Sequence, residues 1–384
     1  MLVLGWYDYR LHCGIERFAQ EHGWRLSEDL AREKVIPWGW DGDAILTWLG
    51  AGDDLADFVC KTNKPTVDFS FRRPELPFTR VLEDTTATAQ LVADHFLSRG
   101  FRHFIFYSDA DNWIYNERGT AFLNHLKNAG RGAEWLRWHA APAYRTDRNA
   151  WKRKREWLAK EIKSAVKPVG IFAASDGLAL EILETCEAND ISVPEQVAIV
   201  GAGNSLLAVD AMHTPVSSVD VNMELVGYRG AELLHELMLS KSAPRREPVR
   251  VQPFRLIIRK SSDLIAVNHP GIAKSLRFMW DHCHEPICVN DLAKVASMSL
   301  RSFHQVFVDH IGRSPGAELQ HIRIEIAKRL LVESDEKLEA IAERCGYQSG
   351  NSLWVAFRQA TGTSPKKFQQ EWGRTRVEPP GVPV

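Results

Sequence analysis

Two clusters of hydrogen-bonding side chains lie about 50 residues apart near the C-terminus. The first comprises Arg301, Ser302, His304 and Gln305, and the second comprises Asn351, Ser352 and Trp354. An arginine can bond guanine through two hydrogen bonds, and glutamine or asparagine can bond adenine in the same way, at about 1–3 kcal/mol of discrimination per pair. A tryptophan can touch a thymine methyl group. These residue types therefore suit contacts with the edges of DNA bases.

Basic residues beside the two clusters suit a different contact. They are Arg313, Arg358, Lys366 and Lys367. Lysine and arginine bind phosphate oxygens, which fixes the register of a protein on a duplex without reading the base sequence. We therefore expect these four residues to contact the DNA backbone.

An internal repeat carries both clusters. Phe303 and Phe307 correspond to Leu353 and Phe357, and Gly-Arg-Ser-Pro at 312–315 corresponds to Gly-Thr-Ser-Pro at 362–365. Each copy predicts a helix, a tight turn and a second helix: 289–296 and 300–309 in the first copy, 338–345 and 351–360 in the second. Gly346 suits the positive φ that such a turn needs. In the repeated Gly-x-Ser-Pro, glycine can end a helix, serine can cap the next one, and proline fits its first position.

The segment between the copies, 316–334, has one continuous apolar stripe and predicts a single amphipathic helix. About 18 helical residues rise about 27 Å, which approaches the ~34 Å of one DNA turn. Two helix-turn-helix units at that separation could enter successive major grooves on one face of a duplex. The alternative is a small helical bundle that makes no DNA contact.

The C-terminal segment of about 110 residues resembles the DNA-binding domain of AraC-type regulators. The resemblance rests on Ile341-Ala342, Gly346-Tyr347, Leu353, Phe357, Gly362, Ser364-Pro365 and Phe368. Helical periodicity predicts that Phe303, Phe307, Leu353 and Phe357 face the core and that the two clusters face outward. The resemblance implies that this outward face contacts DNA. Val355 departs from the pattern, because such proteins often carry a polar or basic residue there, so the second unit is expected to read fewer bases.

The first 259 residues alternate short apolar runs with amphipathic stretches, a pattern that indicates parallel sheets wrapped by helices. Predicted strands are 1–5, 44–48, 65–69, 104–107, 169–173, 197–201 and 251–258, and predicted helices include 87–99 and 178–189. After Arg259 no further strand is predicted. We expect residues 1–260 to form one domain, 261–271 a linker, 272–375 the helical domain and 376–384 a disordered tail.

This first part resembles the effector-binding domain of LacI-type repressors and periplasmic sugar-binding proteins. The residues that carry the resemblance are Asp84, Ala89, His95, Gly100 and Arg102-His103; Arg118 to Phe122; Ser175-Asp176 and Ala179; and Val193-Pro194, Val197, Ile199 and Gly201. A sensor followed by an AraC-type reader resembles the xylose-operon regulator (XylR-like) group. The fold implied is an α/β, two-subdomain, periplasmic-binding-protein-like (type I) sensor followed by an all-α domain with two helix-turn-helix units. The subdomains are expected at about 1–108 plus 217–243 and 109–214 plus 246–260, hinged by crossing strands.

Ligands of such sensors bind where the carboxyl ends of parallel strands converge between subdomains. A sugar offers hydroxyl groups and an apolar ring face, so its site needs charged or amide hydrogen-bonding groups and an aromatic side chain. The candidates that follow predicted strands are Asp8, Asp68, Trp113, Arg118, Asp176 and Asn204. The resemblance gives Arg118 and Asp176 the most weight as ligand contacts. The other four could instead cap helices or shape turns, and Asp176 could itself cap a helix that starts near Gly177.

Related sensors usually carry an acidic residue after a Gly-x pair, whereas this chain reads Gly201-Ala202-Gly203-Asn204. One expected acceptor for a sugar hydroxyl is therefore missing, and Asn204 is the residue that could replace it.

Charge and cysteine content limit other classes of function. The net charge is −1, with 15 Lys and Arg against 13 Asp and Glu from Gly271 onward. Six scattered cysteines without a C-x-x-C pair favour reduced thiols, and no second ligand pair completes a zinc site around His282-Cys283-His284. No apolar run reaches the roughly 18 residues of a membrane span. We expect a cytoplasmic protein without metal, cofactor or catalytic residues, whose partners are a duplex DNA operator, a small-molecule effector, a second copy of itself and, if it activates transcription, RNA polymerase.

Three hypotheses follow. The first is a transcription regulator controlled by a sugar such as xylose. The second is a sugar-processing enzyme with an appended helical domain, which would need a catalytic acid and base and turnover of a bound sugar. The third is a DNA-binding protein with a degenerate sensor, whose affinity for DNA no small molecule would change.

Overall fold

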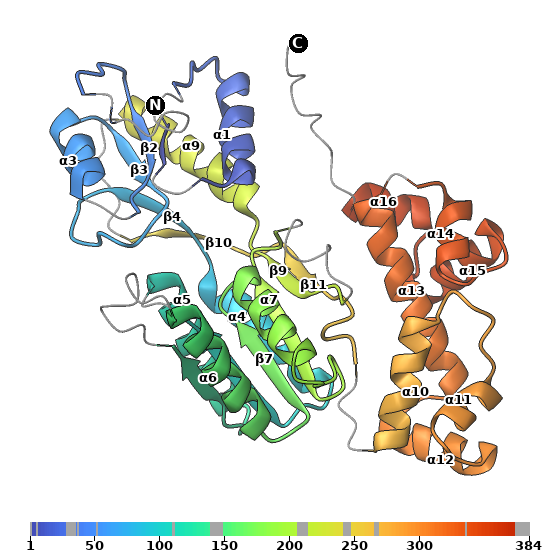
Figure 1. Ribbon diagram of the computed structural model, residues 1–384. Coiled ribbons are helices and arrows are strands. Elements are labelled where there is room, and N and C mark those ends of the chain that lie inside the picture. The colour runs from blue at the N-terminus through green and yellow to red at the C-terminus, as the bar shows by residue number, and fades with distance from the viewer. Residues whose placement is uncertain are drawn as a thin grey trace. The chain divides into compact units, whose positions relative to one another are not determined.

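The computed structural model describes residues 2–4, 7–27, 36, 38–50, 53–109, 112–138, 149–205, 214–240, 247–264, 269–334 and 336–372. The chain divides into two compact units, Met1–Asp263 and Leu264–Val384. Figure 1 shows strands and helices in the first unit and helices in the second. We call them the α/β unit and the helical unit.

The first subdomain of the α/β unit is built on a sheet of parallel strands in the order β1-β2-β3-β4-β10. The strands are β1 (Leu2–Leu4), β2 (Ile45–Trp48), β3 (Thr66–Asp68), β4 (Thr79–Glu83) and β10 (Val249–Val251). Its helices are α1 (Tyr9–Glu21), α3 (Asp53–Thr62) and α9 (Met223–Ser240). Helices α1 and α9 touch through glycines, since a Cβ on Gly14 would lie 1.9 Å from the carbonyl oxygen of Glu224.

The second subdomain has the strand order β11-β9-β8-β7-β5-β6, with β11 antiparallel to β9 and the other pairs parallel. Its strands are β5 (His103–Ser108), β6 (Glu134–Arg137), β7 (Val169–Ala173), β8 (Val197–Ala202), β9 (Ser217–Asp220) and β11 (Arg255–Ile257). Its helices are α4 (Thr85–Ser98), α5 (Trp113–Asn128), α6 (Ala150–Ser164) and α7 (Asp176–Glu187). Strand β7 is buried along its whole length, as expected for a parallel sheet covered on both faces.

The chain passes between the two sheets three times: from β4 into α4, from β9 into α9, and from β10 into β11 (Figure 1). The expected subdomain division was therefore wrong in detail. Strand β5 pairs with β6 and β7 in the second sheet, and the first crossing occurs near residue 84, not near residue 108. Strand β4 was not predicted because Arg80 and Glu83 interrupt its apolar pattern, although all five of its residues are buried.

Helices α10 (Pro270–Asp281), α11 (Val289–Val295), α12 (Leu300–Ile311), α13 (Pro315–Glu333), α14 (Leu338–Arg344), α15 (Gly350–Thr361) and α16 (Pro365–Trp372) form the helical unit. Two hydrophobic cores share α13: its first half packs with α10 to α12, and its second half packs with α14 to α16. Each core therefore supports one helix-turn-helix unit.

The capping chemistry predicted for the repeat is confirmed. Gly312 and Gly362 end α12 and α15 in the left-handed conformation, at φ 79° and 77°. Ser314 caps α13 by accepting from the amide of Ala317, and Pro315 occupies the first turn. Gly346 has φ 74°, and a Cβ there would lie 2.3 Å from the carbonyl oxygen of Cys283, so both backbone shape and space require glycine.

The expected linker at 261–271 differs from the structure at both ends. Ser261, Ser262 and Asp263 are buried in the α/β unit, and α10 already begins at Pro270. The amide of Ser217 donates to the Ser261 hydroxyl over 2.8 Å, which anchors this segment to β9.

The expected disordered tail at 376–384 lies outside the described residues. Within the described ranges, no helix is both long and apolar enough to cross a membrane.

Candidate effector site and nucleic-acid interface

Asp8 and Asn204 meet through Arg10, which joins the two subdomains. Asp8 caps α1 by accepting from the Arg10 amide over 2.8 Å, and its Oδ2 also accepts from Arg10 Nη2 over 2.7 Å. Arg10 Nη1 donates to the carbonyl oxygens of Gly203 at 2.5 Å and Asn204 at 3.3 Å. The start of α1 is thereby tied to the loop after β8. Arg10 was not among the predicted residues, because it lies inside an amphipathic helix.

Asp176 lies in the first turn of α7 and is buried, and Ser175, not Asp176, caps that helix. The carboxylate accepts from the Ser218 hydroxyl at 2.5 Å and from the Ser205 amide at 2.8 Å. Burial raises the pKa of Asp176, while the Ser218 hydrogen bond opposes that shift. The chain leaves room for this carboxylate by placing glycine at 201, where a Cβ would lie 2.5 Å from Asp176 Oδ1.

Asn204 belongs to the same network. It is 1% exposed, its amide donates to the Ser218 hydroxyl at 3.0 Å, and its side-chain oxygen accepts from Arg259 Nη2 at 3.0 Å. Its backbone φ of 50° lies in the left-handed region, which asparagine tolerates better than most residues. Asp8, Asp176 and Asn204, far apart in sequence, are thus brought to one place.

Arg118 makes a second bridge between the subdomains. From α5 it donates to the carbonyl oxygen of Ala174 at 2.5 Å and pairs with the carboxylate of Glu83, at the end of β4. Both side chains are under 10% exposed. A buried ion pair of this kind holds both partners in fixed positions. Glu83 was missed from sequence because β4 itself was missed.

Trp113 begins α5 and faces Phe71, which lies between β3 and β4. The ring centroids are 6.2 Å apart and the planes are inclined by 64°. Two half-buried aromatic rings from different subdomains therefore lie edge to face, in the arrangement that aromatic pairs favour. Such rings can cover the apolar face of a sugar.

Asp68 stands apart from the other five candidates. Its side chain is completely inaccessible, and Oδ1 accepts from the amides of Leu49 at 3.2 Å and Ser70 at 3.0 Å. Burial raises its pKa from 3.8 to about 7. The side chain thus organises the backbone at the end of β3, which is the turn role left open from sequence.

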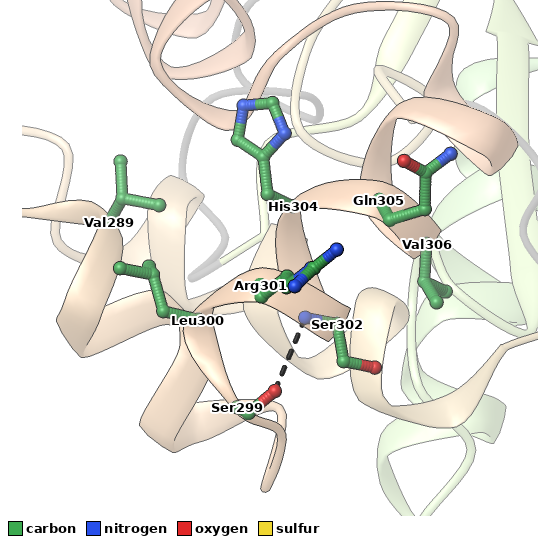
Figure 2. Close-up of a pocket in the computed structure, with 8 residues that line it drawn as sticks. All are labelled: Val289, Ser299, Leu300, Arg301, Ser302, His304, Gln305 and Val306. Atoms are coloured by element: carbon green, nitrogen blue, oxygen red, sulfur yellow. Dashed lines mark hydrogen bonds between the residues drawn. The ribbon is translucent and has the colours of Figure 1, made fainter.

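In the first helix-turn-helix unit, α12 buries Phe303 and Phe307 and exposes Arg301, Ser302, His304 and Gln305. Figure 2 shows these four side chains around an open hollow that Val289 and Leu300 also line. The Ser302 amide donates to the Ser299 hydroxyl at 3.2 Å, which fixes the start of the helix. Gln305 Nε2 donates to Asp309 Oδ1 at 2.9 Å, so its amide is already oriented along the helix.

In the second unit, α15 buries Leu353 and Phe357 and leaves Asn351 exposed and Trp354 half-buried. The Ser352 hydroxyl donates to the Ser349 carbonyl oxygen at 2.7 Å and takes part in the capping box of α15. It is therefore less available for a base than its position alone suggested. Val355 is 53% exposed, so an aliphatic side chain lies at the surface where the resemblance predicted a polar or basic residue.

The four phosphate candidates differ in their surroundings. Lys366 and Lys367 are exposed in the first turn of α16, and Arg358 is exposed on α15 with its guanidinium 5.3 Å from the Trp354 ring. Arg313, in contrast, pairs with the buried carboxylate of Glu318. This ion pair joins the turn before α13 to the first turn of that helix.

Two family models match the chain: one described as a periplasmic binding protein-like domain, at residues 93–262, and one described as a helix-turn-helix domain, at residues 292–371. The chain is 26% identical to the xylose operon regulatory protein of Escherichia coli K12 over 344 residues, or 85% of this chain and 86% of that protein. It is 25% identical over 303 residues to the protein of the same name from Haemophilus influenzae, covering 77% of this chain and 75% of that protein.

Among solved structures, that of the xylose-binding transcription activator XylR matches with a TM-score of 0.72 at 22% identity, covering 97% of this chain and 98% of that chain. At this identity the match establishes the fold. This chain therefore joins a periplasmic binding protein-like domain to a helix-turn-helix domain of the AraC type, and over most of its length it resembles the xylose operon regulatory proteins.

Proposed function

We propose that this protein is a DNA-binding transcription regulator whose α/β unit senses a neutral monosaccharide such as xylose. The proposal rests on two features that occur together in this one chain. Two helices, α12 and α15, present exposed base-reading side chains, and a separate α/β unit gathers charged, amide and aromatic groups between two subdomains. The similarity to xylose operon regulatory proteins supports the same reading.

The charges of the candidate effector site favour a neutral ligand. Arg10 is paired with Asp8, and Arg118 with Glu83. A further ion pair between the subdomains joins Arg250, on β10, to Glu117, on α5. A phosphorylated or acidic ligand would compete with a carboxylate for each of these guanidinium groups. A sugar instead accepts and donates hydrogen bonds through its hydroxyl groups, and Trp113 with Phe71 can cover its ring.

The helical unit suits two adjacent major grooves. The connecting helix α13 has 19 residues, which corresponds to a rise of about 28 Å, close to the ~34 Å of one DNA turn. We assign base contacts to Arg301, His304, Gln305, Asn351 and Trp354. Phosphate contacts are assigned to Arg358, Lys366 and Lys367. Ser302 is exposed and remains a candidate for a base contact, whereas Ser352 and Arg313 remain candidates whose side-chain hydrogen bond or ion pair within the protein competes with DNA.

A route for the signal follows from Asn204. Its side chain accepts from Arg259, whose main chain exchanges hydrogen bonds of 2.8 and 2.9 Å with the Ser217 hydroxyl. Arg259 lies two residues before Ser261, the first residue of the buried segment Ser261–Asp263, after which the chain enters the helical unit. A ligand that binds one arrangement of the subdomains better than another shifts the population toward it, and the exit segment would move with β9.

Further parts of the proposal concern partners. A homodimer would hold two helical units on neighbouring sites of one operator, RNA polymerase would be a partner if the protein activates transcription, and a cytoplasmic location would follow from the DNA target. Sedimentation at micromolar protein, with and without DNA, tests the dimer, and a monomer under both conditions would exclude it.

The effector test is a thermal melt of the full chain against a panel of pentoses and hexoses that includes D-xylose. A ligand at 100 times its Kd adds about 2.7 kcal/mol to the stability of the unit that binds it. We expect a shift with one sugar, lost in Trp113→Ala and retained in Trp151→Ala, because Trp151 is 62% exposed on α6. A flat response to the whole panel would contradict the sugar assignment but not the DNA assignment.

The DNA test is selection of binding sites from a random duplex pool. The proposal expects two short conserved sequence elements about one helical turn apart.

The two competing hypotheses have distinct outcomes. Turnover of a bound sugar would favour an enzyme, and DNA affinity that no sugar changes would favour a protein with a degenerate sensor.

A further inference from the structure

A buried guanidinium holds the loop that connects β3 to β4. Arg80, on β4, is 4% exposed. Its Nη2 donates to the carbonyl oxygens of Arg73 at 2.6 Å and Leu76 at 2.9 Å, and its Nη1 donates to that of Phe78 at 3.2 Å. Three carbonyl groups of one loop therefore converge on one side chain. Because guanidinium is planar and carries five donors, it can satisfy several acceptors at once, which lysine cannot do in the same geometry.

The same loop carries Phe71, the aromatic ring that faces Trp113 of the other subdomain. The Arg80 guanidinium lies 5.5 Å from the centroid of the Phe71 ring, within cation–π distance. Arg80 thus contacts both the backbone of the loop and the ring that the loop presents. Asp68 fixes the beginning of the loop through the Ser70 amide, and the Ser70 hydroxyl donates to the Leu49 carbonyl oxygen at 2.7 Å.

Asp68 and Arg80 also face each other without a hydrogen bond. Asp68 Oδ2 and Arg80 Nε are 3.8 Å apart, both are buried, and neither atom has a hydrogen-bond partner among the described residues. The pair therefore acts through charge and through the backbone groups that each side chain holds separately. A buried charged pair is costly unless it fixes something, and here both members fix the same loop.

We propose that Arg80 is a positioning residue for effector binding: it sets the conformation of loop 70–78 and so holds Phe71 against Trp113, where the two rings select a ligand with a flat apolar face. The proposal deepens the proposed function and depends on it for the ligand. Its structural half, that Arg80 holds the loop, can be tested without any ligand.

The first experiment is hydrogen–deuterium exchange of the full chain without sugar, comparing Arg80→Lys with Glu75→Ala. The amides of Leu76 and Phe78 are hydrogen-bonded within the loop, so they report its opening. We expect exchange at these amides to rise about tenfold in Arg80→Lys, which corresponds to loss of one net hydrogen bond. Glu75→Ala removes only an exposed ion pair with Arg73 of the same loop, so its exchange should match the unaltered protein. Unchanged loop exchange in Arg80→Lys would overturn the proposal.

The second experiment measures D-xylose affinity by calorimetry for Arg80→Lys, Phe71→Ala and the double variant. If Arg80 acts through Phe71, each single change should weaken binding about tenfold, and the double variant should be no weaker than Phe71→Ala alone. Phe71→Tyr should retain affinity because it keeps the ring. Additive losses would show that Arg80 acts elsewhere and would refute its role in binding.

The two experiments separate the two possible failures. If loop exchange rises in Arg80→Lys but the unaltered protein binds neither D-xylose nor another sugar of the panel, the proposed sugar function fails while the positioning of the loop stands. If the unaltered protein binds a sugar and Arg80→Lys binds it equally well, the positioning role fails while the proposed function stands. Exchange in β7 serves as the internal reference for global stability in every variant.

Discussion

Most of the candidate functional side chains are buried and hydrogen-bonded in the α/β unit but exposed in the helical unit. In the α/β unit, Asp8, Arg118, Asp176 and Asn204 are all buried and already bonded to other protein groups. In the helical unit, Arg301, His304, Gln305 and Asn351 are exposed. The difference follows from the partners we propose. A small ligand must be surrounded by groups that are oriented in advance, whereas a duplex is bound by a convex surface whose side chains reach outward.

One consequence is that the same type of substitution should have different effects in the two units. Removing a paired charge from the α/β unit leaves its partner buried and uncompensated, so the fold loses stability. Removing an exposed charge from a reading helix leaves the fold intact and changes only what it binds.

The largest expected effect is at Arg118. Arg118→Met should lower the free energy of unfolding of the α/β unit by about 3–5 kcal/mol, because Glu83 would remain as a buried carboxylate without its cation. Arg301→Met should change the unfolding free energy by less than about 0.5 kcal/mol. Chemical denaturation of both variants measures the contrast. The double variant Arg118→Met with Glu83→Met should recover most of the loss, and failure to recover would show that Arg118 stabilises through packing instead.

The next effect concerns pH. Burial raises the pKa of Asp68 from 3.8 to about 7, so its folded form holds a proton that the unfolded form loses, and its contribution to stability falls as pH rises from about 4 to 7. His95, buried next to Ser262, has its pKa lowered from 6.5 to about 3, so its contribution is present above pH 6.5 and is lost as pH falls below that value. Each pKa unit corresponds to about 1.4 kcal/mol.

Between about pH 4 and 6.5, the contribution of Asp68 to stability falls as pH rises, whereas that of His95 increases. In Asp68→Asn, the stability of the α/β unit should therefore rise more steeply with pH over this range than in the unaltered protein. In His95→Gln, it should fall with pH. Unfolding midpoints from pH 4 to 8 measure both, and parallel curves for all three proteins would rule out these assignments.

A smaller effect is expected at the glycines that frame Asp176. Gly201→Ala would place a methyl group 2.5 Å from Asp176 Oδ1 and should cost about 2–3 kcal/mol through displacement of that carboxylate from Ser218. Gly316→Ala is the matched control in the helical unit. Its Cβ meets no atom within 4 Å, and alanine favours a helix, so stability should be unchanged or slightly higher. Equal losses of stability in Gly201→Ala and Gly316→Ala would contradict the expected difference between the two units.

The smallest effect on the fold and the most informative one on binding concerns Arg301. Arg301→Ala should lose about 1–3 kcal/mol for the preferred sequence and relax the preference at one base position. Lys367→Ala should instead weaken binding to all sequences alike and reduce the salt dependence. Binding to a selected site and to single-base variants of it measures both. A uniform loss in Arg301→Ala would move that residue to the DNA backbone.

Local pattern explains which predictions could be made from sequence. Helix-turn-helix units bury residues at helical spacing, so Phe303, Phe307, Leu353 and Phe357 could be identified as core, and all four are fully buried. The positive φ of Gly346 and the caps at Gly312 and Gly362 are likewise properties of a few neighbouring residues. The exposed faces of α12 and α15 follow from the same periodicity.

The α/β unit contains contacts that local sequence patterns could not predict. Sequence could indicate which residues follow strands, but Arg10 and Gly203 are 193 positions apart, and Arg118 and Glu83 are 35 apart. Nothing in either neighbourhood indicates the partner. Strand β4 escaped prediction because two of its buried residues are charged, and the apolar pattern does not show the groups that balance their cost: Arg118 for Glu83, and Asp68 with three carbonyl groups of the preceding loop for Arg80.

The amino-acid sequence by itself determined the order of the two units, the alternation of strands and helices in the first, and the repeated helix-turn-helix of the second, because each depends on periodicity and turn chemistry over a few residues. Only the tertiary structure decided which charges pair, which candidate residues share one network, and that Asp68 supports a loop of its own subdomain. Those outcomes depend on burial, which raises the energy of every unpaired polar group and is a property of the whole packed chain.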